Sequence, residues 1–319
     1  MQILVTGGAG FIGSTLSDKL LKDGIKVVVI DNFNDYYDVN LKKQNVEPNL
    51  NNPNYKLYQG DICNKELLNK IFSENKIDVV VHLAACAGVR SSIETPLNYV
   101  NSNIYGTVNI LECMKNFDIK KIVFASSSSV YGNCTAEKFS EDLKISEPIS
   151  QYAATKSACE QFLYTYSKLY DICAVCLRFF TVYGPKQRPD LAIRKFTCLM
   201  LKNEPIPVYG DGNSLRDYTY IDDIIDGICS AIEYNKTNYE IINLGGGNPI
   251  TVKEVISTIE KVLKKSAVIN YLPFQKGDVN KTISDITKAK RLLGYTPKTN
   301  FEEGIRKFVE WERNRRGNL

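Results

Sequence analysis

A tyrosine and a lysine four residues apart are the pair in this chain best suited to chemistry. If segment 150–170, which begins Ser-Gln-Tyr-Ala-Ala-Thr-Lys, is a helix, Tyr152 and Lys156 leave the same face about one turn apart. A phenol titrates near ~10 in water, and a nearby ammonium lowers that pKa by favouring the phenolate. The pair could therefore exchange a proton with an alcohol near neutral pH. The alternative is that both side chains merely share a solvated helix face.

A run of four serines lies just ahead of this helix in the chain. Ser126 to Ser129 follow an apolar strand predicted over 121–125. A hydroxyl of this run could be the third partner of the proton transfer, next to a sugar or alcohol oxygen.

A glycine-rich loop near the start of the chain predicts a dinucleotide site. A strand over 2–6 leads into Gly7-Gly-Ala-Gly-Phe-Ile-Gly13, which opens a helix predicted over 11–23. Glycines let backbone amides approach a pyrophosphate, which the helix N-terminus also favours. The next strand, 26–30, ends in Asp31, which can bind a ribose 2′-hydroxyl and would repel a 2′-phosphate. NAD is therefore favoured over NADP.

Strands and helices alternate through the first half of the chain. Further strands are expected at 55–59, 78–82 and 121–125, and helices at about 64–75 and 96–117. This alternation predicts an α/β fold with a Rossmann-type, doubly wound parallel sheet. From about residue 178 the elements become shorter. We expect an NAD-binding domain over 1–177 and a smaller mixed α/β substrate-binding region over 178–319, with some strands and helices returning to the first domain.

Composition argues against several classes of partner. The 319 residues are 44% hydrophobic with a net charge of +4 and no dense basic block, so neither nucleic acid nor an anionic membrane is an expected partner. No stretch approaches the ~20 apolar residues of a membrane span. The N-terminus begins directly with a strand and lacks the features of a signal peptide, which favours a cytoplasmic protein.

Cysteine and histidine usage does not indicate a metal or redox site. Cys173 and Cys176 lie in an apolar run, Ile172 to Leu177, that is typical of a buried strand, so free thiols are favoured over a redox pair. With His82 as the single histidine of the chain, no histidine-based metal site is expected.

Six short motifs occur in a fixed order along the chain. They are Thr6 to Gly13, Gly60-Asp61, His82 to Ala85, Asn103 with Gly106-Thr107, Ser127, and Tyr152 with Lys156. Together they resemble the extended short-chain dehydrogenase/reductase family, in particular its nucleotide-sugar epimerases and dehydratases. The resemblance implies that Tyr152 is the catalytic base, that Lys156 holds the nicotinamide ribose and lowers the tyrosine pKa, and that Ser127 hydrogen-bonds the reacting hydroxyl.

The same resemblance implies further contacts and an assembly. A homodimer through the helices near 96–117 and 150–170 is expected. The residues implied around NAD are Gly7, Gly10, Phe11, Ile12, Gly13, Asp31, Asn32, Asn34, Asp61, Ile62, Leu83, Ala84, Ala85, Ala87, Asn103, Ala125, Tyr152, Lys156 and Phe180.

The serine run indicates which reaction within the family is expected. Related 4,6-dehydratases carry Asp-Glu where this chain has Ser128 and Ser129, and uronate decarboxylases usually keep a glutamate at the second position. Epimerization at C4 is therefore favoured. Segment 178–190 resembles UDP-glucuronate 4-epimerases, whereas neutral-hexose epimerases generally have asparagine where Thr181 stands. A UDP-glucose/UDP-galactose or N-acetylhexosamine 4-epimerase is the alternative, and a UDP-glucuronate decarboxylase or a non-catalytic NAD or nucleotide-sugar-binding module is less expected.

The substrate contacts follow from the same comparison. Hydroxyls of Ser128, Ser129 and Thr181, with Arg90 or Arg188 nearby, could bind a sugar carboxylate, although these arginines could equally be surface salt bridges or loop anchors. Arg216 matches a diphosphate-binding arginine. Asp222 and Asp223 open a helix predicted over 222–234 and are expected to cap it. The residues implied in substrate binding are Arg90, Ser127, Ser128, Ser129, Thr181, Arg188, Arg216 and Asp278.

Overall fold

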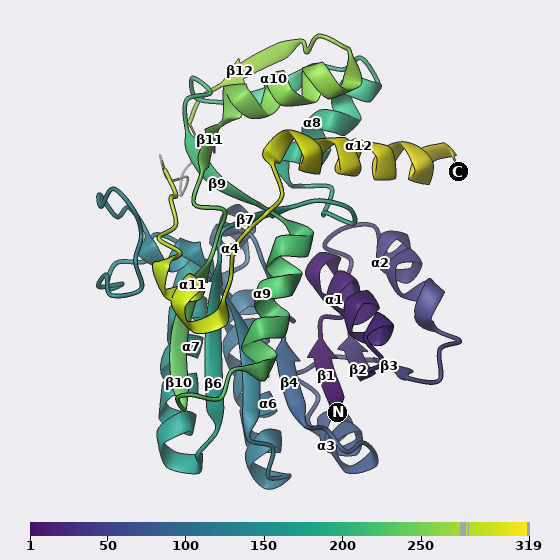
Figure 1. Cartoon of the computed structure of the whole chain (residues 1–319), viewed down its shortest axis with the longest axis vertical. Helices are drawn as coiled ribbons and strands as arrows, with labels where there is room; N and C mark the ends of the chain where they lie inside the picture. Colours follow the sequence, from purple (N-terminus) through teal and green to yellow (C-terminus); the bar gives the residue numbers. More distant parts are fainter. Residues whose placement is uncertain (275–278, 280, 318–319) are drawn as a thin grey trace.

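A seven-stranded parallel sheet forms the centre of the molecule (Figure 1). The computed structural model describes residues 1–274, 279 and 281–317. The strand order is β3-β2-β1-β4-β5-β6-β10, in which every neighbouring pair is parallel. The predicted Rossmann-type doubly wound sheet is confirmed. Its strands are β1 (Gln2–Thr6), β2 (Lys26–Asp31), β3 (Tyr55–Gln59), β4 (Val79–His82), β5 (Lys121–Ser127), β6 (Cys173–Phe179) and β10 (Tyr239–Leu244).

Helices cover both faces of this sheet because successive side chains of each strand point in opposite directions. Ile3 and Val5 of β1 belong to one buried cluster, which includes residues of α1 (Phe11–Lys22) and α9 (Ile221–Glu233). Leu4 belongs to the cluster on the other face, with α3 (Lys65–Glu74), α6 (Gly106–Asn116) and α7 (Gln151–Tyr170). Both faces of the parallel strands are therefore apolar and buried.

The second half of the chain builds two small sheets at one end of the large one. β7 (Thr181–Tyr183), β9 (Leu215–Tyr220) and β11 (Pro249–Thr251) form one, and β8 (Ile206–Tyr209) and β12 (Ile269–Leu272) form the other. β6 runs on to Phe179, and β10 and α9 return to the large sheet. The division of the chain at residue 178 stays a prediction. The helices of this half are α8 (Ala192–Leu201), α10 (Val252–Leu263), α11 (Thr287–Leu293) and α12 (Phe301–Gly317).

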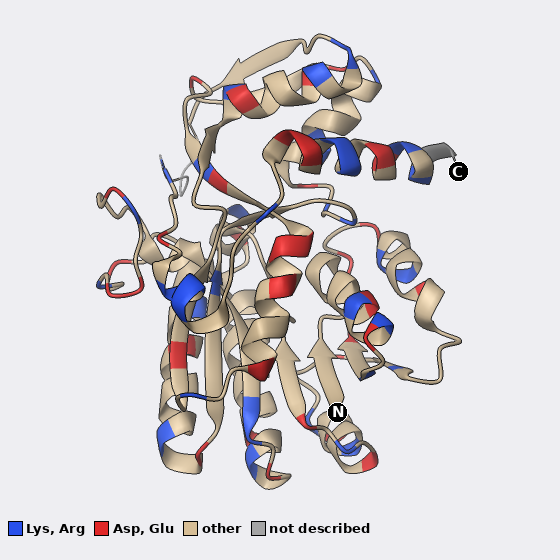
Figure 2. Ribbon diagram, in the orientation of Figure 1, with Lys and Arg blue, Asp and Glu red and all other residues tan. Residues whose placement is uncertain are grey.

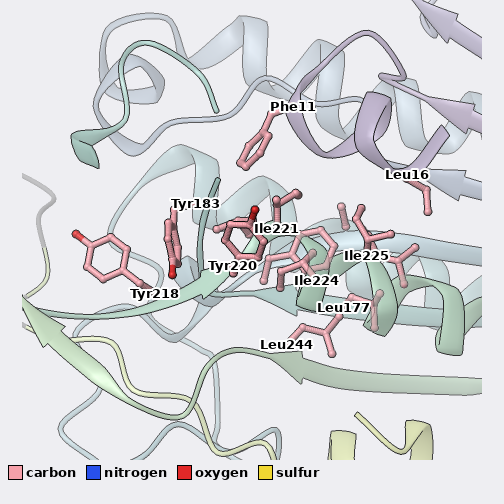
Figure 3. Close-up of a cluster of buried hydrophobic side chains, with 14 of the residues drawn as sticks. Phe11, Leu16, Leu177, Tyr183, Tyr218, Tyr220, Ile221, Ile224, Ile225 and Leu244 are labelled. Carbon is pink, nitrogen blue, oxygen red and sulfur yellow. The ribbon is translucent and has the colours of Figure 1, made fainter. Parts of the chain in front are cut away.

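One apolar cluster joins both halves of the chain (Figure 3). Phe11 and Leu16 of α1 lie in the same buried cluster as Ile221 and Ile224 of α9. The ring of Tyr183 meets the rings of Tyr218 and Tyr220, with centroids 6.2 and 5.6 Å apart. The second half of the chain is thus packed on the same core that supports the glycine-rich loop.

Two helices differ from the sequence expectation. The predicted helix 96–117 is divided: α5 (Pro96–Tyr99) is followed by a π-helix, η2 (Val100–Tyr105), before α6 begins. The expected capping role of Asp222 and Asp223 is wrong. α9 begins after Tyr220 without a side-chain cap, and the Asp223 carboxylate accepts hydrogen bonds from the backbone amides of Lys298 and Thr299. That carboxylate therefore ties the start of α9 to the chain segment ahead of α12.

Charged residues concentrate on the outer helices. Figure 2 shows both signs of charge on α1 and α12, whereas the strands of the large sheet carry few charges. Within the described part of the chain, none of the helices is long and apolar enough to cross a membrane.

Candidate active site

The glycine-rich loop lies between β1 and α1 and packs directly on the loop that follows β4. Gly7 has φ +71°, and a Cβ atom on it would lie 2.8 Å from the Ala84 amide nitrogen. Gly10 stands at the N-cap of α1, and no side chain of the described residues caps this helix. The free amides of the first turn therefore suit an anion such as a pyrophosphate. Phe11, Ile12 and Gly13 form the first turn of the same helix.

Two carboxylates follow the neighbouring strands β2 and β3. Asp31 accepts hydrogen bonds from the backbone amides of Ala9 and Phe33, at 3.0 and 2.9 Å. Asp61 accepts one from the Asn32 amide group at 2.8 Å. Burial opposes the charge of Asp61, but the bonds from the Cys63 amide and Asn32 hold its pKa below the usual value. Both acids are thus fixed at the carboxyl ends of their strands, and Asp31 is the one predicted to bind a ribose 2′-hydroxyl.

A loop of small residues after β4 forms the wall opposite the glycines. Leu83 and Ala84 donate their backbone amides to the Thr6 hydroxyl, at 3.1 and 3.0 Å. At the other end of the loop, the side chain of Asn103 pairs with both the amide and the carbonyl of Cys86. Asn103, predicted as a cofactor contact, is thus engaged with protein backbone.

The Lys156 ammonium is buried next to the tyrosine. Lys156 is only 3% exposed, and its Nζ donates to the carbonyl of Ala125 at 2.6 Å. The same nitrogen lies 6.0 Å from the centroid of the Tyr152 ring. The edge of Tyr152 meets the ring of Tyr99, with centroids 6.2 Å apart and an interplanar angle of 77°. Tyr152 and Lys156 therefore lie on the same face of α7, as predicted. The alternative, in which both side chains are exposed to solvent, is excluded because Lys156 is buried.

The serine run ends β5 and continues into a short 3₁₀ turn, η3 (Ser128–Tyr131). The Ser127 hydroxyl accepts from the Ser129 amide and lies 3.1 Å from the Ser129 hydroxyl. Helix α7 packs on both β5 and η3. The fold thus places Ser127 at the carboxyl end of β5, next to the helix α7 that carries Tyr152 and Lys156.

Phe180 and Thr181 leave the sheet beside the serine run. Phe179, the last residue of β6, pairs in register with Ser127 of β5. Phe180 is buried, and its amide donates to the carbonyl of Leu244 at 3.0 Å. Thr181 opens β7 directly afterwards. Hydroxyls from two strands therefore stand at one edge of the sheet.

A buried ion pair that the sequence did not reveal supports this edge. Arg178 of β6 donates twice to the Glu160 carboxylate of α7, at 2.9 and 2.8 Å, and Ser126 donates to the same carboxylate at 2.6 Å. Burial opposes the charge, but Glu160 holds the pKa of Arg178 above its usual value. The pair clamps α7 to the two strands next to the site.

The three predicted arginines have different surroundings. Arg188 forms a double hydrogen bond to Asp190 and lies 5.3 Å from the Tyr36 ring centroid. Arg90, on α4 (Val89–Glu94), lies 4.7 Å from the Tyr209 ring centroid. Arg216 is on β9, and its guanidinium donates to the carbonyl of Leu215. Asp278 falls outside the described residues.

His82 is enclosed in protein rather than facing a ligand. Its ring nitrogens lie 2.6 Å from the Thr6 hydroxyl and 3.0 Å from the Thr107 hydroxyl. Burial, with the Lys156 ammonium nearby, lowers the pKa of His82 to about 3, so the ring is neutral at physiological pH. Across the described residues, no three His, Cys, Asp or Glu side chains gather into a set that could hold a metal ion.

Residues 4–308 match the protein family described as GDP-mannose 4,6 dehydratase. The chain belongs to this family. The resemblance to nucleotide-sugar epimerases and dehydratases of the short-chain dehydrogenase/reductase type is confirmed. A curated relative, UDP-glucuronate 4-epimerase of Thermodesulfobacterium geofontis, is 47% identical over 311 residues, which cover 97% of this chain and 95% of the relative.

Two solved structures share the whole architecture. The UDP-glucuronic acid 4-epimerase of Bacillus cereus, in complex with UDP-glucuronic acid and NAD, has a TM-score of 0.92 at 40% identity and covers 98% of this chain and 99% of its own. The UDP-glucose 4-epimerase of Thermotoga maritima with UDP-glucose has a TM-score of 0.91 at 35% identity, with 99% of each chain covered.

Proposed function

We propose that this protein is an NAD-dependent isomerase that interconverts UDP-glucuronate and UDP-galacturonate by transient oxidation at C4. The observation that carries the proposal is the buried Lys156 beside Tyr152, at a sheet edge where serines 128 and 129 stand instead of acids. The similarity to UDP-glucuronate 4-epimerases of two bacteria supports this reaction and this sugar.

The residues around the glycine-rich loop fit NAD. The uncapped N-terminus of α1 suits the pyrophosphate, and Asp31 and Asp61 suit the adenosine half. The loop Leu83 to Ala87, with Ala125 and Phe180, lies toward the nicotinamide half. When bound, NAD supplies an acceptor that takes a hydride from the sugar C4 and later returns it to the other face.

The chain's own groups move the proton. Tyr152, as phenolate, accepts the proton of the C4 hydroxyl and gives it back when the ketone is reduced. Lys156 is held by the Ala125 carbonyl, so its charge stays next to the phenol through both steps. Ser127 hydrogen-bonds the same sugar oxygen and orients it toward Tyr152.

The serine run and Arg188 provide the site for the uronate carboxylate. A 4-keto uronate is a β-keto acid, which loses CO₂ when its carboxylate aligns with the carbonyl π system. Hydroxyls of Ser128, Ser129 and Thr181, with the Arg188 guanidinium, hold the carboxylate out of that alignment. Arg216 binds the diphosphate.

The experiment is to incubate the purified protein with UDP-glucuronate and with UDP-glucose in separate reactions and to follow the products by proton NMR. The expected result is a mixture of UDP-glucuronate and UDP-galacturonate, little conversion of UDP-glucose, and no CO₂. Release of CO₂ with a UDP-pentose would instead identify a decarboxylase.

A neutral or N-acetylated UDP-hexose is the second candidate substrate. The Thermotoga maritima structure with UDP-glucose is nearly as similar in fold as the uronate epimerase. Rapid conversion of UDP-glucose in the same NMR assay would favour this alternative.

The proposal includes a homodimer in the cytoplasm. Leu97 and Val100 are 78% and 46% exposed on the helical segment 89–105, and Phe162 and Leu169 are 39% and 65% exposed on α7. Apolar side chains at helical spacing on adjacent helices suit a four-helix interface between two copies. All nine cysteines are free, which suits a reducing compartment. Light scattering on the wild type and on Leu97→Glu tests the assembly, and a monomeric wild type would contradict it.

A further inference from the structure

The hydrogen bonds around His82 have only one consistent set of donors. The Thr6 hydroxyl already accepts the amides of Leu83 and Ala84, so its single hydrogen points to Nδ1 of His82. Nε2 must then carry the ring hydrogen, which it donates to the Thr107 hydroxyl at 3.0 Å. The Thr107 hydrogen in turn goes to the carbonyl of Asn103.

The chain of bonds continues from Asn103 to the catalytic helix. Asn103 lies in the π-helix η2 and is 1% exposed. Its Oδ1 accepts the Cys86 amide at 2.8 Å, and its Nδ2 donates to the Cys86 carbonyl and to the Thr155 hydroxyl, each at 3.0 Å. The Thr155 hydroxyl donates to the carbonyl of Tyr152 at 2.9 Å. Both hydrogens of the Asn103 side-chain amide are thereby used.

Two features show that this chain of bonds sets the position of the loop 83–86. One end of the loop is held by Thr6 and the other by Asn103, and His82 with Thr107 connects the two. The loop also cannot move toward the glycine-rich loop, because the backbone of Ala84 already packs against Gly7. Loss of the hydrogen bond between His82 and Thr107 would therefore release both ends of the loop 83–86 together.

We infer that Thr6, His82, Thr107 and Asn103 are positioning residues that fix the loop 83–86 and the first turn of α7 as one unit. The inference rests on the proposed NAD-dependent function, since this loop lies toward the nicotinamide half of the site. It assigns to the single histidine of the chain a role in cofactor geometry. The unit keeps the loop 83–86 at a fixed position relative to Tyr152 while the keto sugar rotates in the site.

The test compares Thr107→Val, which has the same shape but no hydroxyl, with Thr107→Ser, which keeps the hydroxyl. Thr197→Val is the matched control, because the Thr197 hydroxyl is buried without a hydrogen-bond partner in the described residues. The measurements are hydrogen exchange of the Leu83, Ala84 and Cys86 amides in the full-length protein, the Kd of NAD, and the NADH that accumulates during turnover.

For Thr107→Val we expect exchange at those three amides to become about tenfold faster, and the Kd of NAD to rise about tenfold, because a buried partner loses its hydrogen bond. NADH should accumulate as the keto sugar escapes, with the KM for the UDP-sugar within about twofold of the wild type. Thr107→Ser and Thr197→Val should resemble the wild type.

The outcomes separate this inference from the proposed function. A wild type that binds NAD and epimerizes, together with a Thr107→Val variant unchanged in amide exchange and Kd, overturns the positioning role alone. Equal weakening by Thr107→Ser and Thr107→Val also overturns it, because the effect would then follow the methyl packing. A wild type that binds no NAD overturns both.

Discussion

The cofactor side and the sugar side of the site are built in different ways. On the cofactor side, Lys156, Asn103 and His82 are at most 3% exposed and hydrogen-bonded to the surrounding protein. On the sugar side, Arg188 keeps 19% of its side chain exposed and pairs with an Asp190 that is 39% exposed. In the proposed site, the geometry on the nicotinamide side would thus be fixed in advance, whereas the sugar would meet side chains that can still rearrange.

The most severe test of the fixed side is Tyr152→Phe. Loss of the proton acceptor should lower kcat for UDP-glucuronate about a thousandfold, or ~4 kcal/mol. The content of NAD should stay unchanged, since the ring and its contact with Tyr99 remain. Steady-state NMR assays and absorbance of the extracted cofactor measure the two quantities. A variant that retains most of its activity would refute the assigned role of Tyr152.

Glu160→Ala tests the buried ion pair with Arg178 that holds α7 against β6. It leaves the Arg178 guanidinium buried without its charged partner, and we expect a loss of about 3 kcal/mol in the free energy of unfolding. Urea denaturation measures the change. Glu74→Ala, which removes an exposed carboxylate paired with Lys56, is the control and should change stability little. Similar losses in both variants would remove the distinction between buried and exposed pairs.

The pH dependence of stability tests the neutral state of His82. The native pKa of about 3 lies below the ordinary 6.5, so acid favours proton uptake by the unfolded chain. The contribution is complete above about pH 6.5 and declines as the pH falls toward the native value. The loss of unfolding free energy between about pH 6.5 and pH 4.5 is about 2 to 3 kcal/mol. Urea titrations of wild type and His82→Asn should therefore converge in acid, and parallel pH curves would contradict the assignment.

The smallest predicted effect lies on the adaptable side. Arg188→Ala should reduce kcat/KM for UDP-glucuronate about tenfold more than for UDP-glucose, because a charge-assisted bond to the carboxylate is lost. Arg90→Ala, whose guanidinium lies over Tyr209, should discriminate less. Competition assays with both sugars give the ratio directly. Equal losses for the two sugars would show that Arg188 only supports the loop.

Local patterns in the sequence predicted the secondary-structure elements of the fixed side. Strand β1, the glycines, Asp31 and the spacing of Tyr152 and Lys156 are readable because each depends on neighbours within one βα unit. The single histidine, in contrast, was visible only as part of a motif. Its partners Thr6 and Thr107 lie 76 and 25 residues away, and no local pattern predicts such a bond.

The same limit explains the errors in the second half of the chain. Acidic residues at the start of α9 are normally read as helix caps, yet Asp223 bonds to amides 75 and 76 residues further on. The ion pair of Arg178 with Glu160 joins a strand to a helix and leaves no signature in either element. Such contacts are set by the order of the strands, which periodicity alone cannot give.

The outermost strand of the large sheet has a consequence for how this protein can be divided. β10 comes from residues 239–244 but pairs with residues 174–179 of β6. A fragment ending near residue 180 would therefore expose a bare, apolar strand edge and tend to aggregate. In the proposed enzyme, new sugar specificities would then arise by remodelling loops in place, because the second half of the chain could not be exchanged as a separate module.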